Sequence, residues 1–251
     1  MPKSFALFLV VMLVQVRSVL GTQIIDSLNV QPTRFEHQLT YGNFVVPSSL
    51  ILCGVMGTYV DPFRRWNVDL RDEVLWKSPR KLHFDDQLRY LPVVSVYLLN
   101  FVGVESKNRF VDRSIVIFSS YILTTVTVRA LKSATGIMRP DSSLRTSFPS
   151  GHATLAFAGA EFLWQEYKHK SVWYGVAGYG LAGSVGVMRV INNRHWFADV
   201  LAGAGIGILC TKTAYIIYER VKPRFKNRKV ETLVYPSYNG DGWGVSLAMR
   251  F

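Results

Sequence analysis

Six apolar segments of helical length follow one another along the chain, and they constrain the fold more than any other feature. They cover residues 45–60, 90–104, 113–131, 151–166, 172–188 and 196–218. A helix that crosses a bilayer needs about 20 mostly apolar residues, and only 113–131 and 196–218 reach that length. The pattern predicts an all-α, membrane-embedded fold in which not every helix needs to cross the bilayer.

Composition supports membrane contact and narrows the partners. Lys and Arg outnumber Asp and Glu by 29 to 17, a surplus that is typical of proteins that meet nucleic acid, anionic lipid or a phosphorylated substrate. Nucleic acid is not expected as a partner, because the basic residues lie between long apolar runs. The mean hydropathy of +0.16 is high for an ordinary cytosolic enzyme. Cys53 and Cys210 lie in apolar stretches without a second Cys or a His nearby, so we expect no disulfide scaffold and no metal site.

The segments outside the six apolar runs suggest a division of the chain. Residues 1–21 combine Lys3 with an apolar run and are typical of an export signal, cleaved or kept as an anchor; an ordinary first helix is the alternative. Residues 61–89 mix charges of both signs with Trp and Leu, which predicts an amphipathic helix at the membrane interface or a solvated loop. We therefore expect a helical domain over 22–220, then a basic segment and tail over 221–251.

The tail itself has a strand pattern. Apolar residues from Val245 to Phe251 alternate with Ser246, Ala248 and Arg250. This alternation, which ends on an aromatic residue, resembles the last strand of an outer-membrane barrel. One strand cannot close a barrel, so we expect an edge or surface strand, and the pattern favours a bacterial envelope as the source.

Three short stretches bring cations, histidines and an acid together. They are KSATGIMRP from Lys132 to Pro140, PSGH from Pro149 to His152, and RVINNRHWFAD from Arg189 to Asp199. A single loop cation or histidine is usually structural. All three stretches in this order are improbable by chance, so they mark a functional site.

Phosphoryl transfer from a monoester suits these residues. Lys132, Arg139 and Arg189 supply three positive charges, and the two guanidinium groups can bind phosphate oxygens in a bidentate manner. Ser150 and Gly151 stand where a helix begins, so their N–H groups and the helix dipole favour an anion. We expect neither a metal nor another cofactor, because these groups can stabilise the transition-state charge themselves.

The three stretches resemble the motifs KxxxxxxRP, PSGH and SRxxxxxHxxxD of the type 2 phosphatidic acid phosphatase and vanadium haloperoxidase superfamily. The resemblance covers residues 132–199 and extends to the helices on either side, which implies the six-helix core of that family. Residues 1–45 and those after about 220 are not covered. Met188 stands where the family has a serine, so one hydroxyl contact to the phosphate is absent.

The resemblance also implies a role for each site residue. His195 is expected to be the nucleophile that forms a phosphohistidine, with Asp199 holding the other nitrogen of its imidazole. His152 is expected to protonate the leaving alkoxide and then to help water hydrolyse the intermediate. The phosphate is expected to lie among Lys132, Arg139, Ser150, Gly151 and Arg189. Arg194, which the motif leaves variable, is expected to be a solvated charge.

The apolar helices favour a lipid phosphate as the substrate. The family implies phosphatidic acid, phosphatidylglycerol phosphate, polyprenyl diphosphate and the phosphates of lipid A, and the sequence does not choose among them. A secreted periplasmic non-specific acid phosphatase is the main alternative. A vanadium haloperoxidase and a non-catalytic scaffold with the same fold are further alternatives.

The charge pattern predicts a topology. Basic connections near 105–113 and 167–171, together with the segment after Tyr218, are expected in the cytoplasm, which places the site on the periplasmic side. If residue 22 also lies outside, six spans conflict with this placement. We expect that 45–60 does not cross; otherwise 1–21 is no export signal, or no segment crosses.

Overall fold

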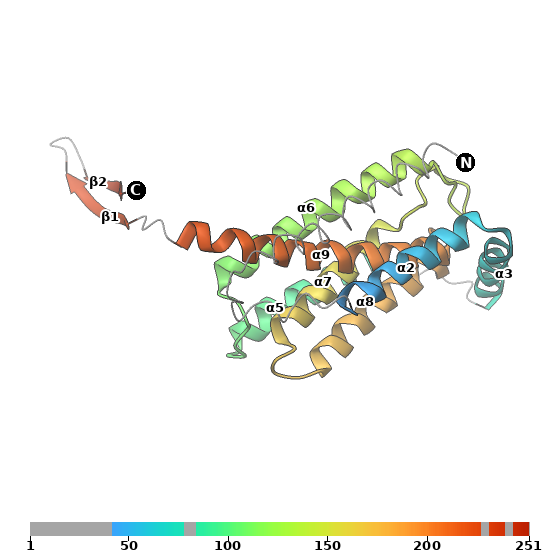
Figure 1. Ribbon diagram of the computed structural model, residues 1–251, viewed down its shortest axis with the longest axis horizontal. Coiled ribbons are helices and arrows are strands. Elements are labelled where there is room, and N and C mark those ends of the chain that lie inside the picture. The colour runs from blue at the N-terminus through green and yellow to red at the C-terminus, as the bar shows by residue number, and fades with distance from the viewer. Residues whose placement is uncertain (1–41, 78–83, 227–230, 239–242, 251) are drawn as a thin grey trace, which may run out of the picture. The chain divides into compact units, whose positions relative to one another are not determined.

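The computed structural model describes residues 42–77, 84–226, 231–238 and 243–250, and the predicted export signal lies outside them. The helices are α2 (Gly42–Tyr59), α3 (Asp61–Lys77), α4 (Asp85–Leu88), α5 (Leu91–Phe101), α6 (Phe110–Thr135), α7 (Gly151–Tyr167), α8 (Trp173–Ile191) and α9 (Phe197–Lys226). Each of the six predicted apolar segments is a helix, and 61–77 is the predicted amphipathic helix rather than a loop. The all-α prediction is confirmed for the described part of the domain (Figure 1).

The chain divides into two compact units, residues 1–214 and 215–251. The second unit contains the end of α9 and the strands β1 (Glu231–Tyr238) and β2 (Trp243–Arg250). These strands pair antiparallel, with Val234 opposite Leu247. The predicted strand of the tail is therefore present, and its partner β1 was not anticipated, because Pro236 disfavours a strand.

Among the described residues, two helices are long and apolar enough to cross a membrane, and they are the two that the sequence predicts. They are Phe110–Thr135 and Phe197–Lys222. Helices α2 and α3 meet at an angle of 88° and together form a third candidate, either a broken span or a re-entrant loop. One face of α6 carries the exposed apolar residues Val111, Ile115, Phe118, Ile122 and Val126. Their helical spacing forms an apolar stripe suited to lipid, so these features are those of an integral membrane protein.

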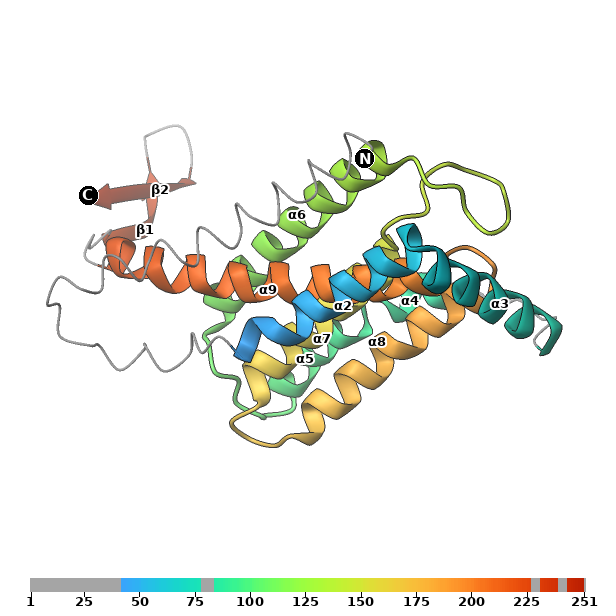
Figure 2. The same ribbon diagram turned by 45° about the vertical axis from the view of Figure 1, so that its right-hand side comes forward.

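Small residues let α9 lie close to its neighbours in the first unit (Figures 1 and 2). A Cβ atom at Gly203 would lie 2.7 Å from the Ser150 carbonyl oxygen, and one at Gly207 would collide with the backbone of α7. At Gly205 the obstacle is the backbone of α2. The stretch of small residues in 196–218 thus packs against two helices at once, as small residues in membrane helices do.

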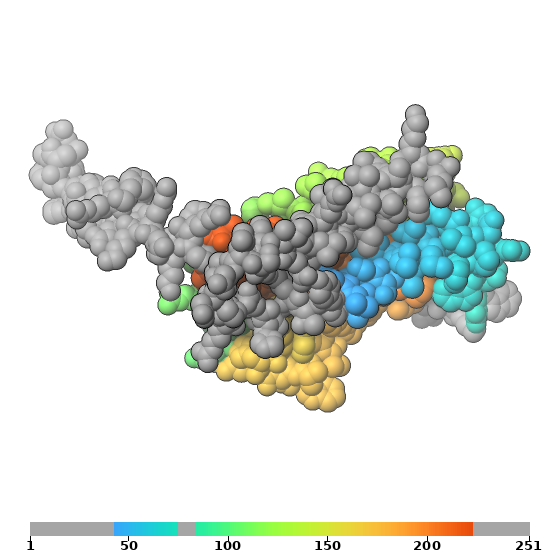
Figure 3. All heavy atoms as spheres, in the orientation of Figure 1, coloured from blue at the N-terminus to red at the C-terminus, as the bar shows by residue number. Residues whose placement is uncertain are grey.

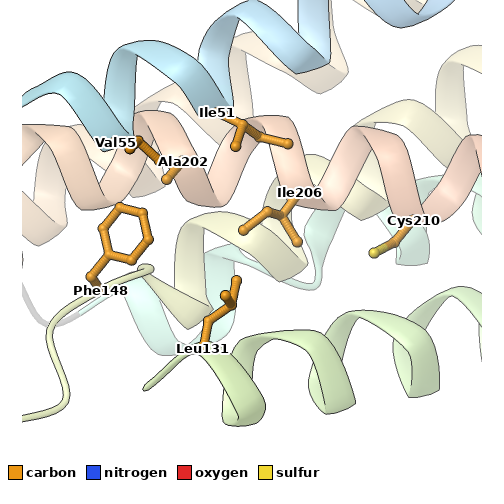
Figure 4. Packing of buried hydrophobic residues seen from close by; sticks show 7 residues of the cluster. All are labelled: Ile51, Val55, Leu131, Phe148, Ala202, Ile206 and Cys210. Carbon is orange, nitrogen blue, oxygen red and sulfur yellow. The ribbon is translucent and has the colours of Figure 1, made fainter. Parts of the chain in front are cut away.

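A hydrophobic cluster anchors the loop before α7 to these helices. Figure 4 shows its residues Ile51, Val55, Leu131, Phe148, Ala202, Ile206 and Cys210. Phe148, from the loop 136–150, is 1% exposed, and Ile137 of the same loop also packs against the cluster. Because the PSGH stretch begins at the next residue, this packing fixes where α7 starts. Helices α2 and α3, blue to cyan, lie at the surface in Figure 3.

Candidate active site

The three predicted stretches meet at one end of the helices of the first unit. Helix α6 ends where Gly136 adopts a left-handed conformation, φ 58°, and its N–H bonds to the Lys132 carbonyl. The loop that follows returns to α7 (Figure 2). There the Ser150 N–H donates to the Asp199 carbonyl at 3.0 Å, which joins the second stretch to the third.

The histidine of the third stretch is buried beside its acid. His195 is 2% exposed, and its Nδ1 lies 3.6 Å from Oδ2 of Asp199. That oxygen accepts hydrogen bonds from the Ser147 hydroxyl at 2.5 Å and the Trp196 N–H at 2.9 Å. The carboxylate is therefore held in place, with a negative charge facing the imidazole.

Burial decides the charge of this imidazole. It lowers the pKa of His195 to about 4, although Asp199 acts in the opposite direction. At neutral pH the ring is uncharged and has a free electron pair on one nitrogen. A neutral buried imidazole beside a carboxylate has the properties of a nucleophile.

Lys132 supplies a positive charge and also holds the loop 136–150 in place through hydrogen bonds. Its Nζ donates to the carbonyl of Thr146 and, at 3.4 Å, to that of Ser147. Since Ser147 also binds Asp199, the predicted cation and the predicted acid are connected through one short piece of backbone.

Two guanidinium groups repel each other at the site. Burial and the charge of Arg189 both lower the pKa of Arg139. The Nε atom of each guanidinium has no hydrogen-bond partner among the described residues. An anion between Arg139 and Arg189 would relieve the repulsion and use the unpaired donors.

The start of α7 is open to an anion. Ser150 occupies the N-cap position, yet its hydroxyl makes no capping bond and is buried without a partner in the described structure. A Cβ atom at Gly151 would meet one methyl group only, at 3.7 Å. The unpaired hydroxyl and the N-terminal N–H groups of a 17-residue helix suit a phosphate oxygen.

Two acidic residues that the sequence analysis did not single out also belong to the site. Asp85 is 4% exposed and accepts a hydrogen bond from Nη1 of Arg189. Oδ1 of Asp86 lies 2.6 Å from Nε2 of His152. Both acids come from α4, in a stretch expected to be a surface helix or loop. Two adjacent aspartates were the one signal there, and acidic pairs are common on solvated surfaces.

Helix α3 braces the start of α9. Its Asn67 accepts a hydrogen bond from the Ala198 N–H at 3.2 Å. Its Arg71 lies 5.4 Å from the centre of the Trp196 ring and donates to the Pro140 carbonyl at 3.4 Å. The predicted interfacial helix therefore contacts the first and third stretches of the site directly.

Arg194 is exposed, as predicted, but it is not simply solvated. Its Nη1 lies 3.1 Å from Oδ2 of Asp141. This ion pair connects Asp141, in the loop after the first stretch, to Arg194, which precedes His195 in the third stretch.

Residues 114–223 match the model of the PAP2 superfamily. The chain is 46% identical over 94 residues to a lipid A 1-phosphatase of Porphyromonas gingivalis, which is 38% of this chain and 21% of that protein. It is 27% identical over 150 residues to a PA-phosphatase related-family protein of Dictyostelium discoideum, covering 48% of this chain and 55% of the relative. The chain thus spans about a fifth and about half of these relatives.

Two solved structures are similar in part. One is Aquifex aeolicus LpxE, with a TM-score of 0.44 and 23% identity, covering 58% of this chain and 93% of that one. The other is a transmembrane PAP2 type phosphatidylglycerolphosphate phosphatase from Bacillus subtilis. Its TM-score is 0.46 and its identity 20%, covering 70% of this chain and 97% of that one.

Proposed function

Residues 114–223 match the PAP2 superfamily model, and from this match we propose that the chain is a member of that superfamily and a metal-independent phosphatase of lipid phosphomonoesters. The observation that carries the proposal is the buried, neutral His195 between Asp199 and the cationic groups of the site. This arrangement offers a nucleophile and an anion site within one set of connected residues.

The proposed reaction has two steps. The phosphate binds among Arg139, Arg189 and the start of α7. Because Nδ1 of His195 faces Asp199, Nε2 attacks phosphorus; the P–N bond forms as the P–O bond to the lipid breaks. His152 gives a proton to the leaving oxygen.

Water completes the reaction. His152, neutral after the first step, takes a proton from water as the water attacks the phosphohistidine. The P–N bond breaks, inorganic phosphate leaves, and both histidines return to their starting states. Lys132, Arg139 and Arg189 stabilise the charge on the transferred group, the role that Mg²⁺ has in other phosphoryl-transfer enzymes.

A lipid is the proposed leaving group. The membrane-capable helices α6 and α9 each have a site residue at one end, Lys132 and Asp199. A bilayer-embedded enzyme meets phosphates on lipids. The relative named lipid A 1-phosphatase supports a lipid phosphate as well. We place the site on the periplasmic side because of the basic connections described above.

Phosphate release by detergent-purified protein tests the proposal. The assay compares a panel of lipid phosphates with a soluble monoester, with EDTA present throughout. We expect turnover in EDTA and a strong preference for one lipid. Equal or better turnover of the soluble ester would favour a non-specific acid phosphatase. Loss of activity in EDTA would refute the metal-independent reaction.

A further inference from the structure

We propose that Asp86 is a positioning residue that fixes the proton on Nε2 of His152, so that the leaving alkoxide takes its proton from Nδ1. This inference rests on the proposed function, and it assigns a task to a residue outside the three motif stretches. It follows from the contacts made by a single nitrogen atom.

Two groups compete for that nitrogen. Nε2 of His152 lies 2.6 Å from Oδ1 of Asp86 and 2.8 Å from Nη1 of Arg89. A carboxylate only accepts hydrogen bonds and a guanidinium only donates them. The contact with Asp86 therefore needs a proton on Nε2, whereas the contact with Arg89 needs a free electron pair there.

The shorter contact decides between the two states. A carboxylate oxygen 2.6 Å from an unprotonated nitrogen would place two electron pairs against each other. The N–H of the imidazole removes this repulsion and forms a charge-assisted hydrogen bond. Arg89 then stays beside the pair as a cation, 4.0 Å from Oδ1 of Asp86.

With Nε2–H of His152 bound to Asp86, only the Nδ1 proton is available for transfer to the leaving oxygen. An imidazolium has two N–H groups, and Asp86 holds the one on Nε2. As the P–O bond breaks, its electron pair goes to the leaving oxygen, and the Nδ1 proton follows. His152 becomes neutral with its Nε2 proton unchanged, so Nδ1 is free to take a proton from water in the second step.

The charges around His152 make Asp86 necessary for this role. Two cations face the imidazole, Arg89 next to α4 and Arg189 from α8, and both disfavour a further positive charge. Burial lowers the pKa of His152 as well, while Asp86 raises it. Without Asp86, the pKa of His152 would be lower still, and less of the imidazolium that protonates the alkoxide would be present.

The neighbouring acid is not a substitute. Asp85 is buried and binds Arg189, whereas the Asp86 side chain is 65% exposed and reaches His152 from the rim. Helix α4 thus directs two adjacent carboxylates to two different groups of the site, one cation and one histidine.

A comparison of leaving groups tests the role. p-Nitrophenolate leaves without protonation, whereas an alkoxide does not. We expect Asp86→Asn to lower kcat/KM, which reports the step that expels the leaving group, about 10- to 100-fold for an alkyl phosphate, within the range of general acid catalysis. For p-nitrophenyl phosphate we expect a loss of less than about threefold. Asp86→Glu, which keeps the carboxylate, should recover part of the alkyl phosphate activity.

Two further measurements separate positioning from structural damage. The His152 pKa, followed by NMR of labelled imidazole, should fall in Asp86→Asn, and the alkaline limb of kcat/KM should move to lower pH with it. Asp61→Asn is the matched control, since Asp61 is an exposed acid paired with Arg64 at 3.4 Å. It should change neither ester's turnover.

The outcomes are distinct. An equal loss on both esters, or no loss on either, would overturn the role of Asp86 while the proposed function stands. An unchanged His152 pKa would overturn it too. A wild-type protein that releases phosphate neither from these esters nor from any member of the lipid phosphate panel would overturn the proposed function, and the role of Asp86 with it.

Discussion

Asp199 lies in the first turn of α9 and reaches back to the residue before that helix, where its Oδ2 accepts the Trp196 N–H at 2.9 Å. This is the acidic half of a capping box, in which a side chain at the third helical position satisfies a free N–H at the helix start. The same oxygen lies 3.6 Å from His195. Helix capping and orientation of the imidazole are therefore one structural feature.

Replacement of His195 removes the proposed nucleophile. We expect His195→Gln and His195→Ala to lower kcat/KM at least about 1,000-fold, as loss of a nucleophile does in other covalent enzymes. Rapid quenching with labelled substrate should trap an acid-labile phosphoprotein in the wild type and none in either variant. Because His195 is buried, its replacement by Ala leaves a cavity that could itself lower activity. The Gln variant is closer in size to His and keeps this cavity small. Substantial turnover by both variants would exclude His195 as the nucleophile.

The pH profile reports the protonation of His195. The attacking imidazole must be neutral, and its pKa is held at about 4, so its protonation should lower kcat/KM only below about pH 5. Because the Asp199 carboxylate favours the imidazolium, Asp199→Asn should lower this pKa and move the acid limb to lower pH. The rate should also fall about 10- to 100-fold as the ring loses its orientation.

The wild type and Asp199→Asn are compared on the same substrate. Ionisation of the substrate's phosphate then affects both pH profiles equally and does not contribute to the difference between them. An acid limb that moves to higher pH in Asp199→Asn would contradict this account of the pair.

The motif stretches and helices were predictable because their signals are local. An apolar run of helical length predicts a helix, and the spacing from Arg189 to Asp199 keeps the cation, nucleophile and acid within 11 residues. The small residues in 196–218 are a local signal as well, because such residues let another helix approach closely. The structure adds that two helices approach there, α2 and α7.

The acids of α4 and the contacts of α3 were not predictable, since their partners lie far away in sequence. Asp85 meets Arg189 across 104 positions, and Asn67 meets Ala198 across 131. A stretch of mixed charges such as 61–89 has the composition of a solvated surface. Only the packing of the helices decides which of its charges face the site.

Close packing of α9 on α7 predicts a penalty at Gly207. A Cβ atom there would collide with the backbone of α7, which cannot yield as a flexible side chain can. We expect Gly207→Ala to lower the free energy of unfolding by about 1–3 kcal/mol. Gly180→Ala is the control, because nothing lies within 4 Å of its new Cβ atom. It should be neutral or stabilising by up to ~1 kcal/mol. Thermal unfolding in detergent measures both; equal effects would refute the contact.

The apolar helices predict tight membrane association. Carbonate washing strips peripheral proteins from membranes, and we expect the chain to stay in the pellet because α6 and α9 are of bilayer-spanning length. A charge in the exposed stripe of α6, Phe118→Asp, should weaken insertion. The control, Phe118→Leu, keeps this position apolar and should leave insertion unchanged. Release of the wild type into the supernatant would contradict the membrane assignment.

Variants of the buried pair Arg189 and Asp85 can distinguish an effect on stability from an effect on catalysis. Loss of one partner leaves an uncompensated buried charge, so Arg189→Met should destabilise the protein by about 3–5 kcal/mol. The double variant with Asp85→Leu removes both charges and should recover most of that loss. It should remain inactive, because Arg189 is needed to bind the phosphate. Unfolding in detergent and phosphate release measure the two properties on the same samples. A double variant no more stable than Arg189→Met would show that the two charges do not compensate each other, and an active one would remove Arg189 from the phosphate site.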